Sequence, residues 1–193
     1  MRQYYSEKFQ RKVYEIFGGN YYATAETNSI IATLLGSCVA VCLRDKSTGV
    51  VGMNHFLLPG DIRRDDMLTS PSAKYGMHAM EILINAMMKL GAKREHFEAK
   101  VFGGGHVLDS SNSSVPDNNI MFVKAYLAME EIPVVAEDLG GNNGRKILYF
   151  TDTTEVYLRR IGKDQVYYLD KETLQRAQKV EEKAGEVNLF GEG

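Results

Sequence analysis

The feature that most constrains the fold is a pair of apolar runs separated by a short polar turn. Val39–Arg44 (VAVCLR) and Val50–Leu57 (VVGMNHFL) predict two strands, and Asp45–Gly49 predicts the hairpin connection between them. Successive positions are apolar in both runs, so we expect both faces of each strand to be covered. Such strands favour a layered fold over a sheet with one solvent-exposed face.

A long helix is expected after this hairpin. Ser70 suits an N-cap, Pro71 suits the first helical position, and Gly91 suits the residue just past the end. Apolar residues at helical spacing predict the face that packs on the sheet. They are Met80, Leu83, Ile84 and Met87.

The second half of the chain predicts further helices and strands. Residues 109–119 (DSSNSSVPDNN) are expected to form an exposed loop, followed by a helix from near Asn119 to about Glu131. A final charged helix is expected from Lys171 to about Lys183. Strands are expected at Ala99–Phe102, Val134–Glu137, Lys146–Phe150 and Glu155–Arg160. No repeat or long linker divides the chain, so the pattern predicts a single mixed α/β domain.

The charge balance excludes several classes of partner. Among 193 residues, 23 Lys and Arg stand against 25 Asp and Glu, which gives a net charge of −2. This balance argues against a duplex nucleic-acid binder and against a polybasic membrane anchor. No apolar run approaches the roughly 18–20 residues that cross a bilayer, and charges are scattered through the N-terminus. We therefore expect no membrane insertion and a cytoplasmic location.

The two cysteines, Cys38 and Cys42, are too few and too close together for a disulfide framework. On one strand they would lie about 13 Å apart, beyond disulfide reach and awkward for sharing one zinc ion with any of the four histidines. We therefore expect no metal site. The commonest fate of a cysteine outside a disulfide is a small core residue, and we assign that role to Cys42.

The hairpin spacing predicts a cysteine–histidine pair. If residues 45–48 form a four-residue loop, Arg44 pairs with Gly49 and Cys38 lies opposite His55, with Cβ atoms roughly 4.5–5.5 Å apart. A bulge at Gly49 would slip this register by one residue and send the two side chains to opposite faces. Cys38 also follows a Gly–Ser pair, where a turn can expose the side chain and direct backbone N–H groups at a substrate oxygen.

Two glycine clusters carry no phosphate-loop motif. Residues 103–106 (GGGH) follow a predicted strand without the GxGxxG or GxxxxGK[ST] spacing, so we expect a close-approach loop that lines the site. Residues 140–146 (GGNNGRK) lead into a strand and not into a helix. We therefore expect a turn there.

Longer motifs resemble a known family. TLLGSCVAVCLRD followed by GVVGMNHFLLP, then AKYGMHAMEILINAMMKLGAKREHFEAKVFGGGHVL and DLGGNNGRKILYF, are similar to the CheD family of chemoreceptor glutamine deamidases. The resemblance extends from about Ile30 to about Arg160. It implies a three-layer mixed α/β sandwich, with residues 1–27 as an N-terminal extension, 28–170 as the CheD-like deamidase domain, and 171–193 as a C-terminal helix and mobile tail.

The resemblance also implies site residues. Cys38 would be the nucleophile, His55 its partner and Thr33 the third catalytic residue. Oxyanion-binding or site-lining roles fall to Gly36, Ser37, Asn54, Gly103 and Gly104. A neighbouring imidazolium would lower the pKa of the Cys38 thiol, and the thiolate would form a thioester with a glutamine side chain. This implied chemistry needs no metal and no organic cofactor.

The implied function is protein-glutamine deamidation of chemoreceptor cytoplasmic domains in bacterial chemotaxis. A CheC-type phosphatase is the implied second partner. Two other functions stay open from the residues: a non-catalytic chemotaxis adaptor on the same fold, and another Cys-His hydrolase such as a peptidase.

Overall fold

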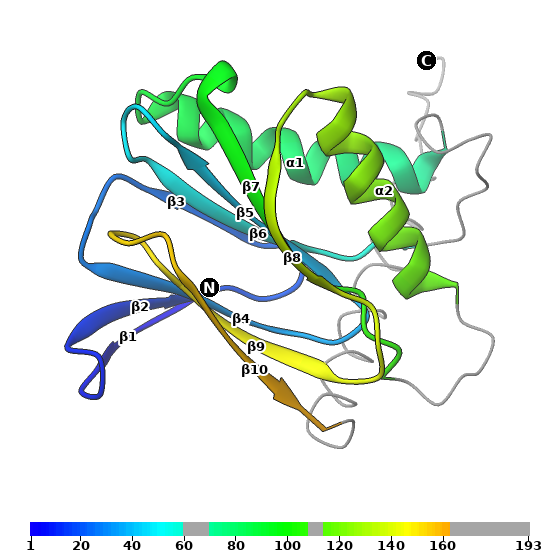
Figure 1. Ribbon diagram of the computed structural model, residues 1–193, viewed down its shortest axis with the longest axis horizontal. Coiled ribbons are helices and arrows are strands. Elements are labelled where there is room, and N and C mark those ends of the chain that lie inside the picture. The colour runs from blue at the N-terminus through cyan, green and yellow to red at the C-terminus, as the bar shows by residue number, and fades with distance from the viewer. Residues whose placement is uncertain (60–69, 108–113, 163–193) are drawn as a thin grey trace, which may run out of the picture.

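The predicted hairpin lies at the centre of a five-stranded sheet (Figure 1). The computed structural model describes residues 1–59, 70–107 and 114–162. The sheet, called sheet B here, has the order β3-β6-β5-β7-β8 and consists of β3 (Tyr21–Thr24), β5 (Val39–Asp45), β6 (Val51–Phe56), β7 (Phe97–Gly103) and β8 (Val134–Leu139). Every residue of β6 is buried, and so is every residue of β5 except Arg44, as expected for strands covered on both faces.

A second five-stranded sheet, sheet A, packs against sheet B. Its order is β1-β2-β4-β9-β10, and its strands are β1 (Arg2–Ser6), β2 (Arg11–Glu15), β4 (Ser29–Leu35), β9 (Gly144–Phe150) and β10 (Val156–Ile161). Both sheets are mixed, because β2 pairs parallel with β4 and β7 pairs parallel with β8. Residues before Asn28 contribute β1 and β2 to sheet A and β3 to sheet B. The domain boundaries after residues 27 and 170 stay a prediction.

The elements stack as three layers. Helices α1 (Pro71–Lys89) and α2 (Val115–Met129) cover one face of sheet B, and sheet A covers the other (Figure 1). One apolar cluster fills the space between the sheets and a second lies between sheet B and the helices. The inter-sheet cluster includes Ile31, Leu35, Cys38, Ala40, Cys42, Met53, Ile147 and Tyr149. The expected three-layer mixed α/β sandwich is confirmed.

Helix α1 has the termini predicted for it. The Ser70 side chain accepts a hydrogen bond from the backbone N–H of Ala73, and Pro71 opens the helix. Gly91, just past the end, has a φ of +98°, in the left-handed region that favours glycine. All four residues of the predicted packing face, residues 80, 83, 84 and 87, are fully buried.

Helix α2 begins earlier than the composition indicated. It starts at Val115, so residues 115–119 are helical and not part of an exposed loop, and it ends at Met129. Pro116 fits the first turn because proline needs no N–H partner there, and it is buried. Asn118 and Asn119 are also buried. Serine and asparagine favour turns in isolation, and the tertiary hydrogen bonds of Asn119 with Leu58 and Ser37 outweigh that preference.

The hairpin register differs from the prediction by two residues. Val39 pairs with Phe56 and Ala40 with His55. The loop therefore occupies residues 46–49, because Asp45 stays paired with Val50 through its N–H and also caps the loop with its carboxylate. A shift of two preserves which face each side chain occupies, since strand side chains alternate with a period of two.

Of the remaining predicted elements, four strands lie within the described residues and one helix lies outside them. The four strands expected in the second half of the chain correspond to β7, β8, β9 and β10. A short 3-10 helix, η2 (Arg94–His96), precedes β7. The helix expected at residues 171–183 lies outside the described residues. Neither α1 nor α2 has an apolar stretch long enough to cross a membrane.

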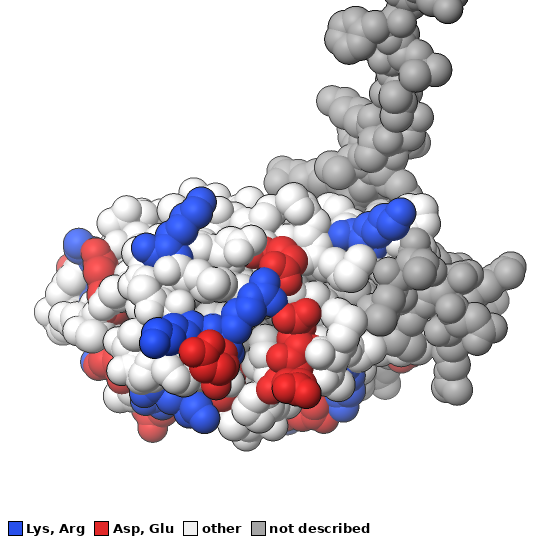
Figure 2. Space-filling view, turned by 90° about the horizontal axis from the view of Figure 1, so that it is seen from above, with Lys and Arg blue, Asp and Glu red and all other residues white. Residues whose placement is uncertain are grey.

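Charges on the helical side of the molecule are interspersed. Viewed from above, Lys and Arg side chains alternate with Asp and Glu on the visible face (Figure 2). Arg94 pairs with Glu81 of α1 and with Glu130 after α2, and Lys124 of α2 pairs with Glu137 of β8. Opposite charges next to one another leave no extended field of a single sign on this face.

Candidate functional site

Cys38 stands where β5 begins, directly after Gly36 and Ser37. Its side chain belongs to the inter-sheet cluster together with Ala40 and Cys42, and it is 1% exposed. Cys42 is equally buried, and burial raises the pKa of its thiol far above the ordinary range. Cys42 is thus a core residue, as expected, with a thiol that stays protonated.

His55 faces the same space from β6. Val51 and Met53 of this strand point between the sheets, and His55 follows at the same two-residue period. Its backbone N–H donates to the carbonyl of Asn20 at 3.0 Å, and its carbonyl accepts from the N–H of Gly19 at 2.8 Å. Cys38 and His55 therefore share one face of sheet B, although they are not directly opposed.

Thr33 reaches the imidazole of His55 from the other sheet. Its Oγ1 lies 2.8 Å from Nδ1 of His55 and donates its own hydrogen to the carbonyl of Ile16, also at 2.8 Å. A hydroxyl has one hydrogen, so Oγ1 must accept from an N–H at Nδ1. In the neutral imidazole this leaves Nε2 unprotonated, with its lone pair available as an acceptor.

Burial keeps this imidazole neutral. His55 is 4% exposed, and desolvation lowers its pKa from 6.5 to about 4. The expectation of an imidazolium beside Cys38 therefore does not describe the resting protein. Nε2 has no hydrogen-bond partner among the described residues, so the structure places Cys38 and His55 in one space without a hydrogen bond between them.

Three consecutive carbonyls before β5 are held by hydrogen bonds. The N–H of Gly105 donates to the carbonyl of Gly36 at 2.8 Å, and the N–H of Gly104 donates to that of Cys38 at 2.7 Å. Between them, Nδ2 of Asn119 donates to the carbonyl of Ser37 at 3.0 Å. Because N–H and C=O point in opposite directions across a trans peptide, these bonds also fix where the N–H groups of Ser37 and Cys38 point.

The glycine loop after β7 can approach this closely only because it lacks side chains. Gly103 has a φ of +118°, and a Cβ there would lie 2.1 Å from the carbonyl oxygen of Cys38. A Cβ on Gly105 would meet the carbonyl oxygen of Asn143 at 2.6 Å. The loop therefore lies against the Gly36–Cys38 segment, in the close-approach role predicted from the sequence.

Asn54 does not face this space. It alternates with His55 along β6, and its side chain binds the carbonyl of Ala79 in α1 and the N–H of Val41. The predicted site-lining role therefore finds no support in its orientation. Two residues near Cys38 were not predicted: Asn119, and Tyr75 of α1, whose pKa is raised by burial and secondarily by Cys38.

A metal site is not formed by the described part of the chain. Within residues 1–59, 70–107 and 114–162, no three His, Cys, Asp or Glu side chains converge as ligands would. The groups brought together are instead a thiol, an imidazole, a hydroxyl and an ordered run of backbone amides. Such a set suits nucleophilic attack on a carbonyl carbon.

Comparison with known proteins gives the family. The model of a family described as "CheD chemotactic sensory transduction" matches residues 57–160. A protein of Chromobacterium violaceum named "Probable chemoreceptor glutamine deamidase CheD 2" is 43% identical over 97% of this chain and 94% of its own. The chain belongs to the CheD family. A Shewanella oneidensis relative, "Probable chemoreceptor glutamine deamidase CheD 1", is 46% identical over 98% of this chain and 93% of its own.

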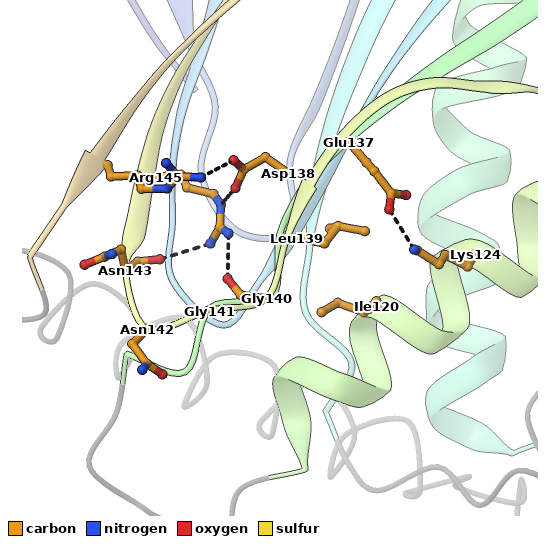
Figure 3. A pocket seen from close by; sticks show the side chains of 11 residues that line it. Ile120, Lys124, Glu137, Asp138, Leu139, Gly140, Gly141, Asn142, Asn143 and Arg145 are labelled. Atoms are coloured by element: carbon orange, nitrogen blue, oxygen red, sulfur yellow. Dashed lines mark hydrogen bonds and ion pairs between the residues drawn. The ribbon is translucent and has the colours of Figure 1, made fainter.

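The region matched by the CheD model includes a turn that supports the glycine loop. The turn joins β8 to β9, and Arg145 closes it by donating to the carbonyls of Gly140 and Asn143 and to the carboxylate of Asp138 (Figure 3). The N–H of Gly140 in turn donates to the carbonyl of Gly103. Arg145 is 3% exposed and forms one wall of a pocket of about 520 Å³.

The CheD match begins at Leu57, after Thr33, Cys38 and His55. The catalytic roles of those three residues therefore stay predictions, together with the lining roles of Gly36, Ser37, Gly103 and Gly104. The structure adds that Thr33 touches His55 and that the two glycines contact the backbone of Cys38.

Proposed function

We propose that this protein is a cysteine-dependent amidohydrolase that converts glutamine side chains of chemoreceptors to glutamate. The names of its CheD relatives support the substrate and the reaction. The observation that carries the mechanism is the 2.8 Å contact between Thr33 and His55, which leaves Nε2 as a base in the space that Cys38 shares.

The first half of the reaction forms a thioester. Sγ of Cys38 attacks the side-chain amide carbon of glutamine while Nε2 of His55 takes the thiol proton. The N–H groups of Ser37 and Cys38 hold the negative oxygen that develops. As the C–N bond breaks, His55 returns the proton to the leaving nitrogen, and ammonia departs.

The second half hydrolyses the thioester. His55 takes a proton from water as the water oxygen attacks the thioester carbon, and the C–S bond then breaks. The proton returns to the sulfur, and the product is a glutamate carboxyl group. Each step uses only the groups named and one water molecule.

Two features of the resting protein bear on this mechanism. Catalytic hydrogen bonds are commonly long before the substrate binds, which accounts for an Nε2 that has no hydrogen-bond partner in the described part of the chain. Cys38 and His55 are 1% and 4% exposed, so substrate binding must be accompanied by a local opening around them. The cytoplasmic location, expected from the sequence, and the CheC-type phosphatase partner, implied by the CheD resemblance, stay predictions.

The experiment is incubation with purified receptor cytoplasmic fragments, followed by mass spectrometry of the receptor. We expect glutamine-to-glutamate conversion by the wild type and by Cys42→Ala, and none by Cys38→Ala. Cys42 is the matched control because it is equally buried on the same face. Binding without conversion would support an adaptor, and new receptor termini would support a peptidase.

A further inference from the structure

Asn119 occupies the place where the β5–β6 ladder would continue. The observed register joins positions that sum to 95, so the next hydrogen-bonded pair after Val39 and Phe56 would be Ser37 and Leu58. In a regular ladder these two residues would bond to each other directly. Instead, the ladder ends at Val39 and Phe56.

The side-chain amide of Asn119 lies between Ser37 and Leu58. Its Oδ1 accepts from the N–H of Leu58 at 2.8 Å, and its Nδ2 donates to the carbonyl of Ser37 at 3.0 Å. Two hydrogen bonds and an amide group therefore replace one direct bond. The strand ends are held apart by the width of that amide, immediately beside Cys38.

The amide is well placed to act as a rigid spacer. Asn119 is 0% exposed, it comes from the first turns of α2, and both of its polar atoms are bonded to backbone. A carboxamide is planar, so its two bonds fix the separation and the relative orientation of the two segments. One segment leads into Cys38, and the other begins three residues after His55.

We propose that Asn119 is a positioning residue for the deamidation reaction, a proposal that rests on the function proposed above. By separating the two strand ends it widens the space between Cys38 and the end of β6, where the glutamine side chain enters. By binding the carbonyl of Ser37 it also directs the N–H of Cys38, which belongs to the same peptide group, away from Asn119. Asn119 touches neither the substrate nor the reacting atoms.

The test compares Asn119→Leu and Asn119→Asp with Thr151→Val. Leucine removes both bonds at similar volume, and aspartate keeps an acceptor for Leu58 but cannot donate to Ser37. Thr151 is the matched control, because its buried hydroxyl also accepts from one N–H and donates to one carbonyl, both of Ser29, at the other end of β4. Asn119→Leu and Thr151→Val each lose an accepted and a donated buried hydrogen bond, so a purely structural role predicts similar effects in these two variants.

The first readout is independent of any receptor: the pH dependence of Cys38 alkylation by iodoacetamide, with the adduct located by mass spectrometry. In Thr151→Val we expect the midpoint of the wild type, because Thr151 and Ser29 do not contact the Gly36–Cys38 segment. In both Asn119 variants we expect the alkylation midpoint to move to higher pH, because a peptide N–H that stabilises negative charge beside Sγ is no longer held in place. A loss of stability alone would change the extent of Cys38 alkylation at every pH and would leave the pH midpoint of the profile in place.

The second readout is kcat and KM on receptor fragments. We expect kcat to fall about 10-fold to 100-fold in the Asn119 variants, with KM little changed, and both to be retained in Thr151→Val. Wild-type alkylation midpoints in both Asn119 variants would overturn the positioning role. If Asn119→Leu does not fold, Asn119→Asp decides the question. A wild type that modifies no receptor would refute the proposed function, while alkylation would still decide the role of Asn119.

Discussion

The buried neutral state of His55 makes the stability of the fold depend on pH. Its pKa is about 4 in the folded protein and 6.5 when solvated. Between these two pH values the imidazole is protonated in the unfolded chain and neutral in the folded protein. The contribution of His55 to the free energy of unfolding is therefore fully present above pH 6.5 and is lost as the pH falls toward 4. From about pH 7.5 to about pH 5, the two pKa values give a loss of about 2 kcal/mol.

Urea unfolding at the two pH values measures this loss. The chain has no Trp, so far-ultraviolet circular dichroism is the suitable signal. The control is His55→Asn, which removes the titrating group, and we expect the pH-dependent loss of stability to shrink by about 2 kcal/mol in it. Carboxylates with lowered pKa values, such as Asp45, lose their contribution at lower pH and do so in both proteins. Equal losses in the wild type and His55→Asn would refute the assignment of His55 as buried and neutral.

Two further predictions concern the support of the Cys38 segment. Gly103→Ala should lower the free energy of unfolding by about 3 kcal/mol and reduce alkylation of Cys38, because its Cβ would collide with a backbone carbonyl; Gly141→Ala, also at positive φ but in open space, should cost only about 1 kcal/mol. Arg145→Leu should cost about 3 kcal/mol, whereas Arg160→Leu, which removes an exposed partner of the same carboxylate, should cost less than about 1 kcal/mol. Urea unfolding checks both pairs, and equal effects within either pair would contradict the reasoning.

Local sequence patterns were sufficient for most of the fold. The hairpin, the capped helix α1 and the later strands follow from the spacing of apolar residues and from the residues that favour turns. Both signals depend only on residues close together in the sequence. The start of α2 was missed because Ser and Asn are read locally as loop residues, whereas Asn119 is stabilised by Leu58 and Ser37, far away in the chain. The register was wrong by two because it depends on which residue closes the loop, and the Asp45 carboxylate decides that.

The candidate site shows the same division. Cys38 and His55 could be placed on one face because an even register error leaves the face unchanged. The insertion of Asn119 between two strand ends had no sequence signal, since it requires three segments that meet only in the folded chain. The neutral state of His55 was also beyond a local pattern, because it results from burial between two sheets.

The Thr33–His55 hydrogen bond determines at which stage of folding the proposed base acquires its orientation. Thr33 belongs to sheet A and His55 to sheet B, so the imidazole acquires its orientation only when the two sheets have docked. Sheet B alone would carry the thiol and the imidazole without the group that selects the tautomer. In the proposed reaction, a chain whose two sheets have not yet packed together lacks an oriented base, so reactivity toward glutamine requires the docked sheets.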